Sequence, residues 1–153
     1  RYLLVGGGIG IPPLMQYGEC LEWPRTAVLG FRTRDKAFPA ITSRFQDHCE
    51  RTCICTDDGT LGRHGFVDAQ VREILEQDSG YTNILACGPK PMLRSVAKAA
   101  NAFGVPCQGS MEERMGCGVG ACLVCATPMK DGTVRHVCKD GPVFNAEEVD
   151  WDA

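Results

Sequence analysis

The chain has 153 residues, and its 44% hydrophobic and 23% charged residues are ordinary for a globular protein of one or two small domains. A formal net charge of −3 argues against nucleic acid as a partner, because such partners select basic surfaces. No apolar run approaches the roughly 18 residues of a membrane-spanning helix, so we expect no membrane partner either.

Apolar stretches and segments with helical periodicity alternate along the first 110 residues. The predicted strands are residues 1–5, 26–31, 51–56, 81–88 and 105–111. The predicted helices are residues 14–22, 41–49, 66–77 and 90–103. This alternation indicates βαβ units, and therefore an α/β fold with a doubly wound, parallel five-stranded sheet.

The first predicted strand runs into the glycine-rich turn GGGIGIPP, and its two prolines suit a helix start. Between a strand and a helix, such a turn binds phosphate through backbone N–H groups and the helix N-terminus. The turn departs from the dinucleotide-binding motif G-x-G-x-x-G, because Pro13 stands in place of the third glycine. The alternative to a phosphate-binding turn is a plain tight turn between strand and helix. Its place at the first strand favours a dinucleotide pyrophosphate. The candidate contacts are Gly6, Gly7, Gly8, Gly10, Ile11 and Pro12.

Two later turns fall at the same edge of the predicted sheet, where ligands of open α/β sheets bind. Cys87-Gly88-Pro89 ends the fourth predicted strand and is placed to line the nicotinamide end of the site. A structural turn with a buried thiol is the alternative. The loop at residues 56–60 follows the third strand, and it either contacts the nucleotide or only turns the chain.

The end of the second predicted strand leaves the choice between NAD and NADP open. An acidic residue there favours NAD and an arginine favours NADP, and Arg32, Arg34 and Asp35 offer both. No pattern points to acid–base chemistry, so we predict no catalytic residue. Each histidine is expected to be a surface or packing residue, namely His48, His64 and His136.

Four cysteines near the C-terminus form the most specific motif of the chain. They follow the spacing C-x4-C-x2-C-x12-C and are Cys117, Cys122, Cys125 and Cys138. The first three reproduce the run that holds plant-type 2Fe–2S clusters. Interleaved glycines, Gly116, Gly118 and Gly120, let backbone N–H groups approach the sulfides of a cluster. A structural zinc site is the main alternative, although zinc ligands usually form two separated pairs. Disulfides are a further one.

Further expectations concern the compartment, the cations beside the motif and the remaining cysteines. Metal ligands must be reduced thiolates, so we expect a cytoplasmic protein. Three cations, Arg114, Arg135 and Lys139, flank the ligands and either offset the negative charge of a cluster or are simply solvated. The other cysteines are expected to pack mostly as small hydrophobic residues, and they are Cys20, Cys49, Cys53, Cys55, Cys87 and Cys107. A second metal site at Cys49, Cys53 and Cys55 is disfavoured, because a strand points its side chains to both faces.

The last third of the chain reads as a separate module. A β-hairpin is predicted there, with strands at residues 123–129 and 133–138 and Asp131-Gly132 at the turn. We therefore expect a nucleotide-binding domain at residues 1–110 and a small cysteine-rich module at residues 111–153.

Electron stoichiometry indicates a missing part. A reduced nicotinamide gives up two electrons as a hydride, whereas a 2Fe–2S cluster ordinarily takes one, and flavins are cofactors that split such a pair. No segment predicts a flavin domain. The chain also enters the apolar run YLLV directly after Arg1. We therefore expect it to be the C-terminal part of a longer protein.

With these motifs, the chain resembles the electron-transfer subunits of NAD-dependent dihydroorotate dehydrogenase, within the ferredoxin–NADP reductase superfamily. The resemblance covers residues 5–144. It rests on GGGIGIPPL, TDDGTLGRHGFV, ACGPKPML and, most specifically, SMEERMGCGVGACLVC…CKDGPVF. It implies that the four cysteines bind a 2Fe–2S cluster and that Gly8, Gly10 and the Cys87-Gly88-Pro89 turn lie along NAD(H).

The same resemblance implies FAD, bound mainly by an N-terminal β-barrel that this sequence does not include. It implies a heterotetramer with an FMN-containing catalytic subunit, which oxidises dihydroorotate to orotate in pyrimidine biosynthesis. The chain would then be an oxidoreductase component that passes electrons from NADH through FAD and the cluster to that FMN. It would not act on dihydroorotate itself.

Two other functions fit parts of the pattern. A reductase component of an oxygenase has the same cofactors, but its ferredoxin part usually has a longer gap before the last cysteine. A zinc-stabilised nucleotide-binding module would carry no electrons, and metal analysis would distinguish it.

Overall fold

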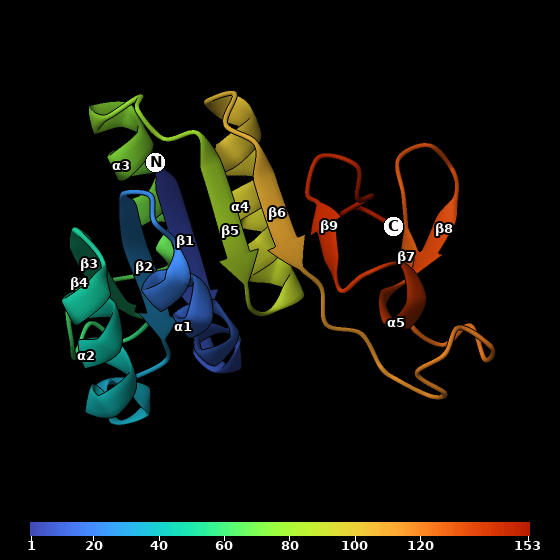
Figure 1. Cartoon of the computed structure of the whole chain (residues 1–153), viewed down its shortest axis with the longest axis horizontal. Coiled ribbons are helices and arrows are strands. Elements are labelled where there is room, and N and C mark those ends of the chain that lie inside the picture. Colours follow the sequence, from blue (N-terminus) through green and yellow to red (C-terminus); the bar gives the residue numbers. More distant parts are fainter.

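The computed structural model describes residues 1–153 and is built on a seven-stranded sheet in the order β4-β3-β2-β1-β5-β6-β9 (Figure 1). The strands are β1 (Tyr2–Gly7), β2 (Arg25–Phe31), β3 (Arg51–Thr56), β4 (Arg63–His64), β5 (Asn83–Cys87), β6 (Cys107–Ser110) and β9 (Val143–Asn145). All neighbouring pairs are parallel except β6 and β9, which are antiparallel. The sheet is therefore mixed, with a large parallel part.

The prediction of five strands was wrong in number. The five predicted strands form at their expected places, and the structure adds β4 and β9. Strand β4 has two residues and pairs with β3 after the loop that follows Thr56. Strand β9 has three residues and lies beyond the cysteine motif. Neither segment is long enough to show a strand period in the sequence.

Helices cover both faces of the sheet (Figure 1). The longer helices are α1 (Ile11–Cys20), α2 (Pro39–His48), α3 (Val67–Gln77) and α4 (Lys90–Ala102), and two 3-10 turns are η1 (Gly8–Gly10) and η2 (Arg34–Lys36). Helices α1 and α2 pack on one face, and α3 and α4 pack on the other. This two-sided cover is the doubly wound arrangement that the alternation of strands and helices predicts.

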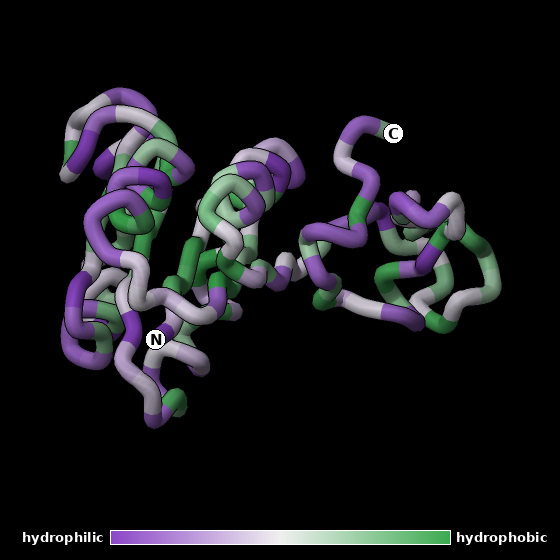
Figure 2. The backbone as a smooth tube through the Cα atoms, turned by 90° about the horizontal axis from the view of Figure 1, so that it is seen from above, coloured by the Kyte–Doolittle hydropathy of each residue, from purple (hydrophilic) through white to green (hydrophobic).

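The central strands read as unbroken apolar runs because both of their faces are buried. In β1, Leu3, Leu4 and Val5 have no exposed surface. Leu3 and Val5 join the core under α3 and α4, whereas Leu4 joins the core under α1 and α2. Figure 2 shows these apolar strands enclosed between helices of mixed hydropathy.

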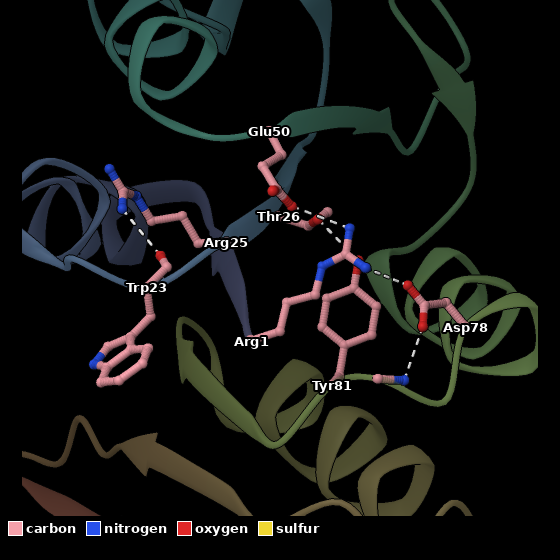
Figure 3. Close-up of polar contacts among 8 residues, drawn as sticks. Arg1, Trp23, Arg25, Thr26, Glu50, Asp78 and Tyr81 are labelled. Carbon is pink, nitrogen blue, oxygen red and sulfur yellow. Dashed lines mark hydrogen bonds and ion pairs between the residues drawn. The ribbon is translucent and has the colours of Figure 1, made fainter.

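A polar cluster ties the strands together near the amino end of β1 (Figure 3). The guanidinium of Arg1 pairs with Asp78, lies 3.1 Å from Glu50 and stands 5.0 Å above the ring of Tyr81. The hydroxyl of Tyr81 shares a buried 2.8 Å hydrogen bond with that of Thr26. These contacts connect β1, β2 and the loops before β3 and β5, away from the carboxyl ends where a ligand would bind.

The C-terminal segment forms the smaller lobe of the molecule (Figure 2). It contains β7 (Ala126–Pro128), β8 (Val134–His136) and the short helix α5 (Val137–Asp140). Strands β7 and β8 pair antiparallel. Phe144, Val149 and Trp151 of this segment share one hydrophobic core with the sheet and α4. Across the whole molecule, no helix combines the length and the apolar character needed to cross a membrane.

Candidate functional site

A cavity of about 430 Å³ lies at the carboxyl ends of the central strands. The end of β1 and the glycine turn contribute Gly7 and Gly8 to its wall, and the end of β2 contributes Phe31 and the residue after it, Arg32. Asp57 lines it from the loop after β3. The remaining wall comes from the first residues of α3 and α4, including Phe66, Asp68, Pro89 and Met92. The cavity is thus where open α/β sheets bind their ligands.

Each glycine of the turn after β1 meets different surroundings. Gly8 has a φ of +55°, and a Cβ at this position would meet no atom within 4 Å, so its backbone is open to a ligand. A Cβ on Gly7 would lie 2.4 Å from Sδ of Met92, and one on Gly6 would lie 2.8 Å from Cγ1 of Ile11. A Cβ on Gly10 would lie 2.3 Å from the carbonyl oxygen of Cys87.

The structure therefore separates the predicted nucleotide contacts into two groups. Gly7, Gly8 and Pro89 line the cavity. The others do not, and these are Gly6, Gly10, Ile11, Pro12, Cys87 and Gly88. Within this second group, Gly10 lets the glycine turn pack directly on the Cys87–Gly88 peptide. The two predicted turns are thus brought together in space, and Gly10 serves that close approach.

Sequence reasoning missed several residues of this cavity. Phe66 was predicted only as the first residue of the helix at 66–77, yet its side chain is 68% exposed and lies at the cavity, just before α3. An exposed aromatic residue directly after Gly65 was the available signal. Asp68 was not considered. Asp57 belongs to the loop whose role was left open, and Arg32 to the group with both signs of charge.

The charges at the cavity are mixed. Helices α3 and α4 both begin there, and the positive ends of their dipoles favour an anion. One guanidinium, that of Arg32, faces the same cavity as the carboxylates of Asp57 and Asp68. A second, wholly polar pocket lies between the segment after β2 and the loop after β3. It is lined by Thr33, Arg34, Asp35, Asp58 and Thr60.

In that second pocket, hydrogen bonds hold the loop after β3 in place. Thr60 donates from its hydroxyl and its backbone N–H to Oδ1 of Asp58, at 2.7 and 3.0 Å. These bonds lower the pKa of Asp58 below its usual value. Arg34 donates from its backbone N–H and its Nε to Thr60. This arrangement ties the loop after β3 to the end of β2.

The cysteine motif forms a loop whose N–H groups point at sulfur. Val119, Ala121 and Cys122 donate backbone N–H groups to Sγ of Cys117, at 3.4, 3.2 and 3.4 Å. These bonds lower the pKa of Cys117 to about 6, and the bond from Val119 has the largest effect. The thiolate is the form that binds metal, so the loop prepares Cys117 for ligation.

Backbone hydrogen bonds link the four cysteines in two pairs. The backbone N–H of Cys117 donates to Sγ of Cys122 at 3.3 Å, and that of Cys138 donates to Sγ of Cys125 at 3.5 Å. The side-chain hydrogen bond with Cys125 raises the pKa of Cys138. Gly120 connects the loop to the second pair, because its N–H donates to Sγ of Cys138 at 3.2 Å.

Glycine permits this loop in two ways. Gly118 and Gly120 have φ of +72° and +79°, a region that side chains disfavour. A Cβ on Gly116 would lie 2.7 Å from Sγ of Cys122. One residue of the loop with a positive φ is not glycine. Leu123 has a φ of +62°, and its side chain is 60% exposed.

Cysteines outside the motif behave differently. Burial raises the pKa of Cys55 to about 11 and that of Cys107 to about 12. Burial also raises the pKa of Cys49 and Cys87. These four thiols therefore stay protonated at neutral pH and pack as small apolar groups.

The motif fits a 2Fe–2S cluster by its donor set. Four thiols stand as two pairs, and such a cluster takes four thiolates. Backbone N–H groups already point at the sulfurs, as the surroundings of such clusters require. No three or more His, Cys, Asp or Glu side chains are grouped closely enough to hold a single metal ion.

The fold and the cysteine motif define a class of protein: a ferredoxin reductase-like α/β fold joined to an iron–sulfur binding segment. A solved structure described as an NADH-dependent reduced ferredoxin-NADP oxidoreductase superposes on this chain with a TM-score of 0.84. It is 32% identical, over 99% of this chain and 54% of its own.

Residues 112–150 match the iron-sulfur cluster binding domain of dihydroorotate dehydrogenase B. Over 97% of its length the chain is 44% identical to the "Dihydroorotate dehydrogenase B (NAD(+)), electron transfer subunit" of Geobacillus thermodenitrificans. It is 38% identical, also over 97%, to the subunit of the same name from Caldanaerobacter subterraneus. The chain spans 57% and 59% of these two relatives. It belongs to the family of these electron transfer subunits.

Proposed function

We propose that the chain is part of an electron-transfer subunit that passes electrons from NADH, through FAD and a 2Fe–2S cluster, to the FMN of a dihydroorotate dehydrogenase catalytic subunit. The observation that carries this proposal is the pairing of the four cysteines within a segment that matches the iron-sulfur binding domain. The relatives are electron transfer subunits by name. The compartment in this proposal is the cytoplasm, where the thiols stay reduced.

The cavity at the carboxyl ends of β1 and β2 would hold NAD(H). Gly7 and Gly8 would face the pyrophosphate with backbone N–H groups, and Pro89 would place the nicotinamide on the β5 side. The adenosine half would then lie on the β2 side, where the ring of Phe66 is free to stack on the base. The charges there do not decide between NAD and NADP, because Asp57 and Asp58 disfavour a 2′-phosphate whereas Arg32 and Arg34 favour one. NAD is the cofactor that the names of the relatives carry.

The cysteine-rich module, residues 111–153, would hold the cluster through Cys117, Cys122, Cys125 and Cys138. The cluster supplies one-electron transfer when bound. The residues around it bind and orient it, because backbone N–H groups of the loop already point at the sulfurs. Residues 1–110 would form the nucleotide-binding domain in this division.

The remaining partners belong to the whole subunit. FAD would be bound mainly by a part of the full protein outside this sequence. The catalytic subunit would carry FMN, oxidise dihydroorotate and assemble with the electron transfer subunit as a heterotetramer. In this proposal the role of this chain is electron transfer, and the oxidation of dihydroorotate belongs to the catalytic subunit.

Anaerobic mixing of the full-length subunit with its catalytic subunit tests this function. NADH, added without dihydroorotate, should produce the EPR signal of a reduced 2Fe–2S cluster, and orotate should then be reduced to dihydroorotate. Replacing NADH by NADPH should slow both changes. A complex that reduces orotate from NADH at full rate after the cluster has been removed would contradict the proposal.

A further inference from the structure

Lys139 differs in its surroundings from Arg135, a second cation that flanks the cysteines. The guanidinium of Arg135 lies 3.3 Å from a carboxylate oxygen of Glu148. Lys139 has no carboxylate within ion-pair distance, although Asp140 follows it in the chain. Asp140 is instead turned towards His136, from whose backbone N–H it accepts a 2.7 Å hydrogen bond. The charge of Lys139 is therefore not neutralised by a neighbouring acid.

The stem of Lys139 also lies against the ligand-bearing loop. A Cβ on Gly120 would lie 2.9 Å from Cδ, 3.3 Å from Cβ and 3.6 Å from Cγ of Lys139. Three carbons of the lysine thus occupy the space beside Gly120, and the Gly120 N–H donates to Sγ of Cys138 at 3.2 Å. Arg114, the third flanking cation, is exposed and precedes this loop. Lys139 is thus the flanking cation with a known contact to the loop.

We propose that Lys139 is a positioning residue for the iron–sulfur group: its stem holds the Gly120 peptide on Cys138, and its ammonium favours the reduced state. This inference rests on the function proposed above. Reduction adds one electron, and so one negative charge, to a group that four thiolates already make anionic. Lys139 directly follows the proposed ligand Cys138 in the chain, and a positive charge near such a group stabilises its reduced form and raises its midpoint potential.

Three substitutions separate the charge of Lys139 from its stem. Lys139→Met keeps an apolar stem without the charge, Lys139→Arg keeps a charge, and Lys139→Ala removes both. Lys130→Met, in the exposed turn between β7 and β8, is the matched control for loss of one lysine charge. The measurement is an EPR-monitored redox titration of the full-length protein at two ionic strengths, together with iron per chain.

The midpoint potential should fall in Lys139→Met and stay near the wild-type value in Lys139→Arg and Lys130→Met. The difference between Lys139→Met and wild type should shrink at high ionic strength, because salt screens exposed charges. A purely structural lysine would show no such dependence. Lys139→Ala should in addition contain less iron per chain, because the Gly120 peptide loses its support.

An unchanged midpoint potential in fully loaded Lys139→Met would overturn the electrostatic role, whether or not Lys139→Ala folds. Full iron content in Lys139→Ala would overturn the positioning role. A wild-type protein without a 2Fe–2S cluster would instead overturn the proposed function, and this inference with it. The two failures are therefore distinguishable.

Discussion

At the scale of single residues, the contact between the glycine turn and the Cys87–Gly88 peptide is set by Gly10. A Cβ there would lie 2.3 Å from the Cys87 carbonyl oxygen and 2.6 Å from the Gly88 nitrogen. Backbone cannot move aside as a flexible side chain can, so Gly10→Ala should lower the free energy of unfolding by about 1–3 kcal/mol. Nucleotide affinity should fall as well, because the two turns that flank the proposed nucleotide site would move apart.

Chemical denaturation and NADH titration measure these two effects. Gly109→Ala is the control, since its added Cβ would meet only Cδ2 of Leu93 at an ordinary 3.8 Å. Gly10→Ala and Gly109→Ala variants of equal stability would contradict the packing role given to Gly10.

The ligand assignment is also a residue-scale claim. Cys122→Ser should sharply reduce the iron–sulfur absorption, because the second sulfur of its pair is lost. Cys20→Ser, at an exposed cysteine on α1, should leave the absorption unchanged. The visible spectrum and the iron content of each variant decide the matter. A cluster fully retained in Cys122→Ser would remove that residue from the ligand set.

Residue spacing predicted the glycine turn and the cysteine motif, because few residue types supply a positive φ or a thiolate. It did not predict the separate roles of Gly8 and Gly10, since the role of Gly10 depends on contact with a peptide 77 positions away in sequence, whereas Gly8 meets no neighbouring atom. Nor did it identify Phe66 as a wall of the cavity. Its position there follows from how α3 packs on the sheet, which periodicity does not describe.

At the scale of elements, the N-terminus of α3 is the part of the cavity that the adenosine half of NADH would contact. Phe66→Ala should weaken NADH binding by about 1–3 kcal/mol through the loss of base stacking. Phe66→Tyr should bind NADH nearly as well as wild type. Binding of nicotinamide mononucleotide, which lacks the adenosine half, should be unchanged in both variants. A Phe66→Ala variant that loses both ligands equally would contradict this assignment.

The C-terminal segment after the cysteine motif is held to the sheet by β9 and Trp151. The indole N–H of Trp151 donates to the carbonyl oxygen of Ala146 at 2.7 Å, and its ring shares the core with α4. Trp151→Ala should cost about 3–5 kcal/mol of unfolding free energy. Trp151→Phe should cost much less, since it keeps an aromatic ring in the core, although a smaller one, and loses the hydrogen bond. Thermal denaturation of the two variants measures the difference, and equal losses would contradict the packing argument.

Sequence periodicity predicted the four long helices and all strands of the parallel part except the two-residue β4, because strands buried on both faces are long apolar runs. It did not predict that β9 returns to pair with β6, since three residues carry no period. The pairing depends instead on Phe144, which is buried in the same core as α4. Elements whose position depends on distant packing are those that the sequence alone did not reveal.

At the scale of the whole molecule, α4 connects the nucleotide cavity with the cysteine-rich segment. Its first turns line the cavity, and its buried face packs on the core of the C-terminal lobe. Two ion pairs add to this contact: Lys90 lies 3.9 Å from Glu113, and Arg94 pairs with Asp152. The two sites therefore share one rigid helix.

The central claim is that the molecule carries electrons through an iron–sulfur cluster, and one measurement tests it directly. The anaerobically purified protein is analysed for iron, acid-labile sulfide and zinc, and its EPR spectrum is recorded before and after dithionite. Two irons per chain, with a rhombic signal that appears on reduction, are the predicted result. One zinc per chain, without colour or signal, would contradict the claim and leave a nucleotide-binding domain with a structural metal site.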